Sequence, residues 1–432
     1  MRGLTRRLVA VAAVATSIVA VSPVAAQAHG GGGKGKSYVK VGYFTQWGIY
    51  GRNFQLSKVQ NSGAAARLTH VNYAFGPVTK DGTCISADPW ADWGTSFPDE
   101  LSVDGVGDVA GQPLAGNLNQ LAELKAKNPR LRVLISLGGW SGSAYFSDAA
   151  LTDASRKKLV SSCVDLWIKG NLPEHAPGVA AGIFDGVDLD WEWPGSDGNA
   201  GNVIRPEDKQ NFTLLAAEFR KQLDKLGRTT RKHYDLTAFL PASPAKIAAG
   251  FEGDKIFKYL DFGTVQGYDY HGTWETRTNQ QSSIFVPKGA PDNPDFSADN
   301  AINAWVQAGA PKRELVLGMP YYSQGWTGIT SGGDGRFATA TGPAPSVFGG
   351  GTEDYKTVKN LPGFKVYRDW KAGNSWLFDG TTYWTYDDPA QLLQKTFYIR
   401  AKGLGGAMMW SLDGDDENAS LTKAVSFGLS HR

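Results

Sequence analysis

Eight short β-rich runs, separated by helical patterns, recur along most of the chain. They are rich in Val, Ile, Phe and Tyr, and several are almost continuously apolar, as strands buried on both faces are. The runs cover residues 38–47, 68–78, 131–140, 184–193, 234–241, 262–270, 315–322 and 405–412. Alternating strands and helices predict a parallel sheet, and about eight such strands predict an α/β fold of the (β/α)8 TIM barrel type. The alternative is a doubly wound open sheet, although the chain has no GxGxxG or GxxxxGK motif for a nucleotide.

The clearest helical pattern follows Pro206, which suits a first helical turn, and Gly227 suits its end. Apolar residues recur at helical spacing through residues 212–223. Shorter helical patterns cover residues 118–125 and 389–402. The interval between the last two strands is long and rich in Gly, Tyr and Trp, so we expect a small α+β insertion at about residues 325–400, before the last strand. One long loop is the alternative, which compact domains rarely contain.

The N-terminus has the pattern of a secretory signal peptide, predicted to cover residues 1–28. Three arginines precede an apolar stretch at residues 8–20, and Ala26-Gln27-Ala28 forms a small-x-small cleavage site. The apolar stretch is short for a membrane anchor, the alternative, which needs about 20 residues. We therefore expect a secreted, extracellular protein that begins near His29 and has no membrane partner. Residues 29–37 are rich in Gly and Lys and predict a flexible lead-in to a catalytic barrel over residues 38–430.

Charge and sequence motifs argue against nucleic-acid and metal partners, and the pairing of the two cysteines stays open. The formal net charge is +2, and no basic run follows the first residues, which argues against a nucleic-acid partner. The chain has six His and neither an HExxH nor a CxxC motif, so we expect no metal and no cofactor. Cys84 and Cys163 could pair in an exported protein, but a core of this size does not require a disulfide.

Three acidic residues with a spacing of two follow one another in the fourth β-rich run: Asp188, Asp190 and Glu192. Side chains alternate along a strand, so the three share one face, and near the end of a barrel strand that face points toward the mouth. Carboxyl groups this close cannot all ionise near neutral pH, so one keeps a proton. A solvated edge strand or a hard-cation site is the alternative, but a cation would need more oxygen ligands.

Glu192 has the longest side chain of the three acids and lies nearest the end of the predicted strand. We therefore assign it as the general acid in the first step and the general base in the second. Asp190 would alternate its hydrogen bonds between Asp188 and the substrate, while Asp188 would hold and tune the proton on Asp190. Asp185 is out of phase with the three acids, so we expect it to have a structural role.

The four acids Asp185, Asp188, Asp190 and Glu192 form the pattern DxxDxDxE. This pattern resembles the signature of family 18 glycoside hydrolases, the chitinases.

Further motifs extend this resemblance over almost the whole chain from residue 38. Residues 136–140, Ser-Leu-Gly-Gly-Trp, resemble the third-strand motif of the family. Tyr268 and Asp269 resemble its sixth-strand Tyr-Asp pair, and Trp410 resembles its eighth-strand tryptophan. The predicted insertion resembles the one that marks the deep-cleft subfamily A.

The resemblance implies hydrolysis of β-1,4 linkages between N-acetylglucosamine units of chitin and its oligomers, with retention at the anomeric carbon. The nucleophile would be the 2-acetamido oxygen of the sugar, which forms an oxazolinium ion. Asp190 would accept the acetamido N–H, and Tyr268 would donate its hydroxyl to the acetamido oxygen. Asp269 would bind the sugar at the cleavage point, and Trp410 would form the floor under it. We expect the enzyme to act as a monomer.

Sugar rings stack on aromatic side chains, and six further aromatics are candidates to line the cleft: Tyr43, Phe75, Trp140, Trp193, Trp274 and Tyr321. Among them Trp140 and Trp274 match family positions for the leaving-group side. Gln266, a further candidate for substrate binding, stands where the subfamily usually has methionine, and Gln324 stands where many relatives carry arginine. These two departures concern contacts with the sugar and leave the assignment of the acid unchanged.

Two other functions are compatible with parts of this pattern. An endo-β-N-acetylglucosaminidase that acts on glycoprotein glycans would use the same acids and differ in the loops that line the cleft. A non-catalytic chitin-binding lectin would typically lack the acid, whereas Glu192 is present.

Overall fold

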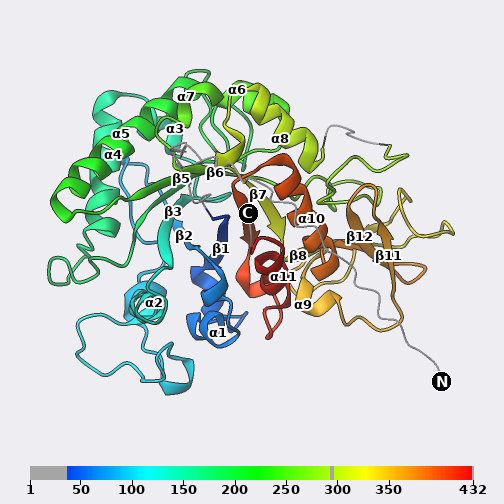
Figure 1. Cartoon of the computed structure of the whole chain (residues 1–432), viewed down its shortest axis with the longest axis horizontal. Coiled ribbons are helices and arrows are strands. Elements are labelled where there is room, and N and C mark those ends of the chain that lie inside the picture. Colours follow the sequence, from blue (N-terminus) through cyan, green and yellow to red (C-terminus); the bar gives the residue numbers. More distant parts are fainter. Residues whose placement is uncertain (1–36, 292–295, 431–432) are drawn as a thin grey trace, which may run out of the picture. The chain divides into compact units, whose positions relative to one another are not determined.

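Eight parallel strands close into a barrel in the order β1-β14-β7-β6-β5-β4-β3-β2 (Figure 1). The computed structural model describes residues 37–291 and 296–430, so the predicted signal peptide and nearly all of the lead-in lie outside it. The barrel strands are β1 (Val39–Thr45), β2 (His70–Gly76), β3 (Arg132–Gly138), β4 (Gly186–Asp190), β5 (Asp235–Leu240), β6 (Phe262–Val265), β7 (Leu315–Pro320) and β14 (Gly406–Trp410). Each lies within one of the eight predicted runs. The (β/α)8 barrel is therefore confirmed, and the open sheet is wrong.

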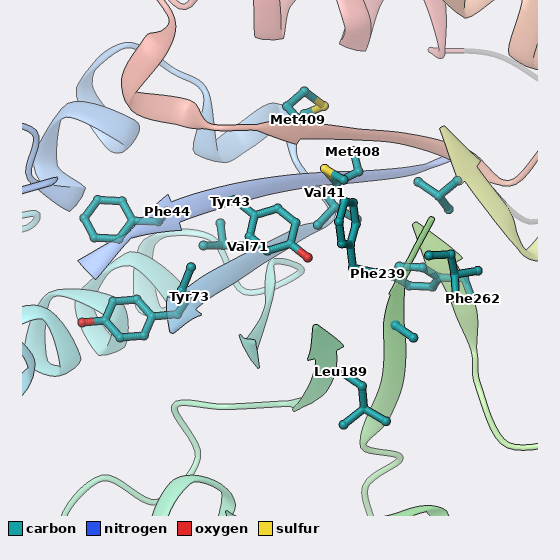
Figure 2. Packing of buried hydrophobic residues seen from close by; sticks show 14 of the residues in the cluster. Val41, Tyr43, Phe44, Val71, Tyr73, Leu189, Phe239, Phe262, Met408 and Met409 are labelled. Carbon is teal, nitrogen blue, oxygen red and sulfur yellow. The ribbon is translucent and has the colours of Figure 1, made fainter. Parts of the chain in front are cut away.

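The barrel strands are apolar on both faces because one face packs inside the barrel and the other against the helices. Successive residues of β1 show this alternation in Figure 2, where Phe44 and Tyr43 point to opposite sides of the strand. Phe44 stacks on Tyr73 of β2, with ring centroids 6.0 Å apart. Tyr43 turns inward and reaches an acid of β4.

Helices connect the strands and cover the barrel (Figure 1). They are α1 (Leu56–Asn61), α2 (Gly116–Lys127), α3 (Phe146–Ala150), α4 (Asp153–Cys163), α5 (Asp208–Thr230), α6 (Pro244–Gly250), α7 (Gly253–Ile256), α8 (Ala298–Gln307), α9 (Tyr355–Val358), α10 (Pro389–Lys402) and α11 (Ser420–Gly428). The predicted helices appear as α2, α5 and α10. The end predicted at Gly227 is wrong, because α5 continues to Thr230 and stops where Arg231 adopts a left-handed conformation, with φ 56°.

An antiparallel sheet lies between β7 and β14 in the sequence and contains the labelled strands β8, β11 and β12 of Figure 1. Its order is β10-β8-β13-β12-β11, with β9 paired to β8. The strands are β8 (Tyr322–Thr327), β9 (Gly342–Pro343), β10 (Thr352–Asp354), β11 (Lys365–Asp369), β12 (Asn374–Phe378) and β13 (Tyr383–Tyr386). Trp326, Trp376 and Tyr383 form a separate small core in this sheet. The expected insertion is thus present, and the single long loop is wrong.

All eight barrel strands end before their predicted runs do, and β4 and β6 fall short by the most. β4 ends at Asp190 and β6 at Val265, so Glu192 and Tyr268 lie in the loops that follow them. The peptide bonds Ala74–Phe75, Glu192–Trp193 and Trp410–Ser411, at the corresponding ends of three strands, are cis. The candidate residues therefore gather at the C-terminal ends of the barrel strands, where loops supply most of the shape of the mouth.

A disulfide bond joins Cys84 to Cys163, with the two Cα atoms 4.9 Å apart. It ties the long segment after β2 to the end of α4 and answers the question that the sequence left open. Across residues 37–291 and 296–430, no helix is long and apolar enough to span a bilayer.

Candidate active site

Asp188 lies inside the barrel and is completely buried. Tyr43 and Ser136 donate to its Oδ2 at 2.7 and 2.8 Å, and Thr237 donates to its Oδ1 at 2.5 Å. Burial raises the pKa of Asp188, while these hydrogen bonds act in the opposite direction. Three strands other than β4 therefore hold this carboxyl group in one orientation.

Asp190 follows two residues later on β4 and is 3% exposed. Its Oδ1 is buried and accepts no hydrogen bond from the described part of the chain. Burial raises the pKa of Asp190 well above its ordinary value, and the charges of Glu192 and Asp188 raise it further. A buried acceptor without a donor is costly, so a ligand N–H or O–H placed there would be bound favourably.

Glu192 lies just beyond the end of β4, and its backbone is held from both sides. Its N–H donates to Oγ of Ser143 at 2.9 Å, and its carbonyl accepts from Nδ2 of Asn202 at 2.8 Å. Burial, followed by repulsion from Asp269, raises the pKa of Glu192 from 4.5 to about 8, although a hydrogen bond with Asp190 lowers it. At neutral pH this carboxyl group therefore keeps its proton, as a general acid requires.

Tyr268 and Asp269 approach the same acids from the loop after β6. Tyr268 is nearly buried, and burial together with the charges of Asp190 and Glu192 raises its pKa well above 10. Its hydroxyl stays protonated and can donate. Asp269 has a left-handed backbone, with φ 54°, and its Oδ1 accepts hydrogen bonds from Tyr322 at 2.6 Å and from Gln324 at 3.2 Å.

Three aromatic rings form a continuous group at the ends of β1, β2 and β14. Trp410 stacks on Phe75 with ring centroids 5.7 Å apart, and Phe75 packs against Trp47 at 6.0 Å. Trp410 and Phe75 are half-buried, and Trp47 is exposed. Trp140 and Trp274 are 53% and 62% exposed, so large areas of both rings are open to a ligand. These positions are compatible with stacking of sugar rings.

Three of the predicted cleft aromatics are buried, so those predictions are corrected. Tyr43 is 1% exposed and bonds Asp188 below the mouth. Tyr321 is fully buried and shares a hydrogen bond with Thr422 of α11, on the helix side of the barrel wall. Trp193 is 4% exposed and packs on Phe239, with ring centroids 5.3 Å apart. Closing the barrel and covering it with helices leaves none of these rings a face for stacking.

Two other predicted residues have distinct environments at opposite ends of the barrel, Gln266 at the mouth and Asp185 at the far end. Gln266 directly follows β6 and is partly exposed, with its Oε1 3.5 Å from the N–H of Ala242. Asp185 precedes β4, where it accepts from Lys125 and from the N–H of Val133. Asp185 thus has the structural surroundings expected from its phase.

The groups that could ligate a metal within the described residues lie elsewhere. His233, Asp235 and Asp261 come together at the N-terminal ends of β5 and β6, which is the opposite end of the barrel from the acids. Both carboxylates already have cationic partners, since Arg132 pairs with Asp235 at 2.5 Å and Arg220 with Asp261 at 3.3 Å. This cluster is an ion-pair network that joins neighbouring strands.

Tyr322, Trp47 and Ser143 belong to the site region but were not among the predicted site residues. Tyr322 directly follows Tyr321 at the end of a predicted strand, so the alternation of side chains could have indicated which tyrosine faces the mouth. Trp47 lies at the C-terminal end of the first β-rich run, and the predicted site residues lie at the C-terminal ends of other runs. Ser143 acts through the backbone of Glu192, for which the sequence carries no signal.

A closed barrel with a protonated glutamic acid and a buried carboxylate at its mouth defines a site for general acid catalysis. Residues 39–415 match the family described as Glycosyl hydrolases family 18. The chain belongs to this family.

Named relatives extend this result. The chain is 36% identical over 421 residues to Chitinase A1 of Niallia circulans and over 402 residues to Chitinase 63 of Streptomyces plicatus. These alignments cover 88% and 90% of this chain but only 57% and 60% of those proteins. The catalytic domain of psychrophilic chitinase B from Arthrobacter TAD20 superposes with a TM-score of 0.87 and 47% identity, covering 91% of this chain and 95% of that one.

Proposed function

We propose that the protein hydrolyses β-1,4 linkages between N-acetylglucosamine units of chitin and its oligomers. The observation that carries this proposal is the buried Oδ1 of Asp190, which has no hydrogen-bond partner among the described residues, beside a glutamic acid that keeps its proton. An acetamido N–H matches that acceptor, and a glycosidic oxygen matches that acid. The three relatives described above are named chitinases, which supports the same substrate.

The proposed reaction proceeds with retention in two steps. In the first, Glu192 gives its proton to the leaving glycosidic oxygen while the acetamido oxygen of the same sugar attacks the anomeric carbon, which yields an oxazolinium ion. Asp190 accepts the acetamido N–H and stabilises the positive charge, and the Tyr268 hydroxyl donates to the acetamido oxygen. In the second step Glu192 takes a proton from water, the water oxygen bonds to the anomeric carbon, and the oxazolinium ring reopens.

Holding the sugar for this attack is the task of the surrounding residues. Asp269 would bind a sugar hydroxyl at the cleavage point, and Trp410 would form the floor beneath the ring. Trp140 and Trp274, both exposed, would stack on sugars on the leaving-group side. An intramolecular nucleophile held in this way reaches effective molarities of about 10⁵–10⁸ M.

Incubation with a hexamer of N-acetylglucosamine and mass spectrometry of the products test the proposal. Glu192→Gln removes the transferable proton and keeps the shape, so we expect the rate to fall at least ~10²–10⁴-fold with binding retained. The matched control is Glu207→Gln, an exposed residue before α5. Wild-type turnover by Glu192→Gln would refute the assignment of the acid.

The fully deacetylated hexamer tests the nucleophile separately. Without the acetamido oxygen no oxazolinium ion can form, so the wild-type enzyme should leave this oligomer intact. Cleavage at a rate comparable to that of the acetylated hexamer would contradict substrate assistance. Release of glycans from a glycoprotein, with the hexamer left uncleaved, would favour the endo-β-N-acetylglucosaminidase instead.

We also propose that the protein is exported after removal of residues 1–28. The signal-peptide pattern supports this, as does the disulfide between Cys84 and Cys163, because disulfides persist in oxidising compartments. N-terminal sequencing of protein from the culture medium should find a start near His29. A start at Met1 would contradict the proposal.

A further inference from the structure

The loop after β6 presents Trp274 at the centre of a tight turn. The N–H of Glu275 donates to the carbonyl of Gly272 at 2.9 Å, which closes the turn. The indole ring folds back onto the turn, since a Cβ added to Gly272 would lie 2.1 Å from the nearest ring atom. Trp274 is 62% exposed, so little else supports the ring. Its orientation therefore depends on the shape of the turn.

His271, directly before the turn, and Glu275, its last residue, are joined through their side chains. Nδ1 of His271 lies 3.1 Å from Oε1 and 3.0 Å from Oε2 of Glu275. An ionised carboxylate only accepts hydrogen bonds, so Nδ1 carries the hydrogen. The side chains of His271 and Glu275 are 5% and 18% exposed. Water and salt therefore weaken this contact less than they weaken an exposed pair.

The inserted sheet holds the same turn from outside. Trp326 of β8 donates its indole N–H to the carbonyl of Glu275 at 3.0 Å. Thr273 donates its hydroxyl to the carbonyl of Gly350 at 2.6 Å. These two contacts anchor the turn to the insertion, whereas the contact between His271 and Glu275 ties its beginning to its end.

We propose that His271 and Glu275 form a positioning pair that holds Trp274 ready for a sugar beyond the cleaved bond, on the leaving-group side. The inference rests on the proposed function, in which Trp274 stacks on that sugar. A ring that is held in place before the substrate binds loses less side-chain entropy on stacking. The pair thus favours substrates that extend past the cleavage point over substrates with a small leaving group.

A double-mutant cycle separates this role from general support of the fold. His271→Phe keeps a ring but removes the donor, so kcat/KM on the N-acetylglucosamine hexamer should fall about 3–10-fold, as for the loss of one aromatic contact. The same substitution made in Trp274→Ala should have no further effect, because no ring remains to be positioned. Equal falls in the two backgrounds would overturn the inference.

His271→Asn tests whether the donor itself is what matters. The amide nitrogen of Asn is bonded to Cγ, as Nδ1 of His is, so it can donate to Glu275 from nearly the same place. This variant should keep most of the wild-type kcat/KM on the hexamer. A fall as large as that in His271→Phe would contradict the role given to the pair.

The nitrophenyl glycoside of the N-acetylglucosamine dimer is the matched substrate, because its leaving group contains no sugar. His271→Phe and Trp274→Ala should both lower kcat/KM on the hexamer more than on this glycoside, and equal losses on the two substrates would overturn the inference. The exposed pair of Lys157 with Asp153 on α4 supplies the control variant. Asp153→Asn should leave kcat/KM on both substrates unchanged.

A measurement that needs no activity separates the inference from the proposed function. In protein labelled with 5-fluorotryptophan, the ¹⁹F resonance of Trp274, assigned by its loss in Trp274→Phe, should shift or broaden in His271→Phe and in Glu275→Ala. It should stay in place in Asp153→Asn. If the wild-type protein cleaves no oligomer but these changes appear, the proposed function fails and the positioning of Trp274 stands. If one of the two variants does not fold, the other decides, and an unchanged resonance in the folded variant would overturn the inference.

Discussion

Three carboxyl groups on one strand end have three different environments. Asp188 receives three hydrogen bonds inside the barrel, and Glu192 is held by its backbone at the mouth. Asp190 is buried, and one of its oxygens has no hydrogen-bond partner within residues 37–291 and 296–430. Their spacing of two residues points them in a similar direction. Their different distances from the barrel mouth give each carboxyl group different hydrogen-bond partners. A proton is held at the residue nearest the substrate because burial and neighbouring negative charge both oppose its loss.

Tyr268→Phe tests the hydroxyl donor without changing the ring. We expect kcat on the hexamer to fall ~10²–10³-fold, as for the loss of a donor that stabilises a transition state, because the acetamido oxygen would lose its orientation. KM should change much less. Tyr259→Phe, at a partly buried tyrosine after α7, is the control. A Tyr268→Phe enzyme with unchanged kcat would exclude Tyr268 from the reaction.

At the scale of elements, the loops beyond the strand ends and one strand of the insertion complete the site. β4 supplies Asp188 and Asp190, and the loops after β4 and β6 supply Glu192, Tyr268 and Asp269. β8 supplies the groups that orient Asp269. The segment after β2 is long, and the Cys84–Cys163 disulfide anchors it to α4. A few hydrogen bonds and one disulfide thus hold together elements that are far apart in the sequence.

Replacing both cysteines with serine tests the link between the β2 segment and α4. Residues 84 and 163 are separated by 79 positions, so the crosslink removes much entropy from the unfolded chain, and its loss should lower the free energy of unfolding by about 4 kcal/mol. Urea unfolding of the variant and of the wild type measures this. Treatment of the wild type with reductant should produce the same destabilisation. An unchanged midpoint would show that the disulfide does not stabilise the fold.

At the scale of the whole molecule, folding buries acids that would be ionised in the unfolded chain. Burial raises the pKa values of Asp92 and Asp415 to about 6, and that of Glu192 is about 8, compared with ordinary values of 3.8 and 4.5. Between these ordinary values and the raised ones the folded state binds more protons than the unfolded state. The contribution of these groups to stability is therefore full at low pH and is lost as pH rises to about 8.

We expect the free energy of unfolding to fall on the order of 5 kcal/mol between pH 5 and pH 9 from these groups. Thermal unfolding followed across this range measures the change. Glu192→Gln should flatten the dependence up to about pH 8 and should be more stable than the wild type at pH 8, because it removes a buried group that must otherwise lose its proton. Glu207→Gln should follow the wild-type curve. Identical pH dependence in Glu192→Gln and the wild type would mean that Glu192 titrates normally in the folded protein.

Many of the helices and strands of this protein can be predicted from local patterns of apolar and polar residues. The eight β-rich runs, the helices at residues 118–125 and 389–402, and the insertion before the last strand follow from periodicity, which acts over a few residues. The shared face of Asp188 and Asp190 follows from alternation along β4, and Glu192 continues the same spacing just past the end of that strand. The motifs of residues 185–192 and 136–140 also identify the family from the sequence, as the match over residues 39–415 confirms.

Only the tertiary structure decided which aromatic rings remain open and what surrounds each acid. Tyr321 and Tyr322 are neighbours of the same type, yet one packs under α11 and the other bonds Asp269. The pairing of Cys84 with Cys163 and the contact of Gln324 with Asp269 join residues far apart in the sequence. Burial and charge interactions depend on distances in space, which barrel closure and the docking of the inserted sheet determine, whereas periodicity along the chain records only which face a side chain takes.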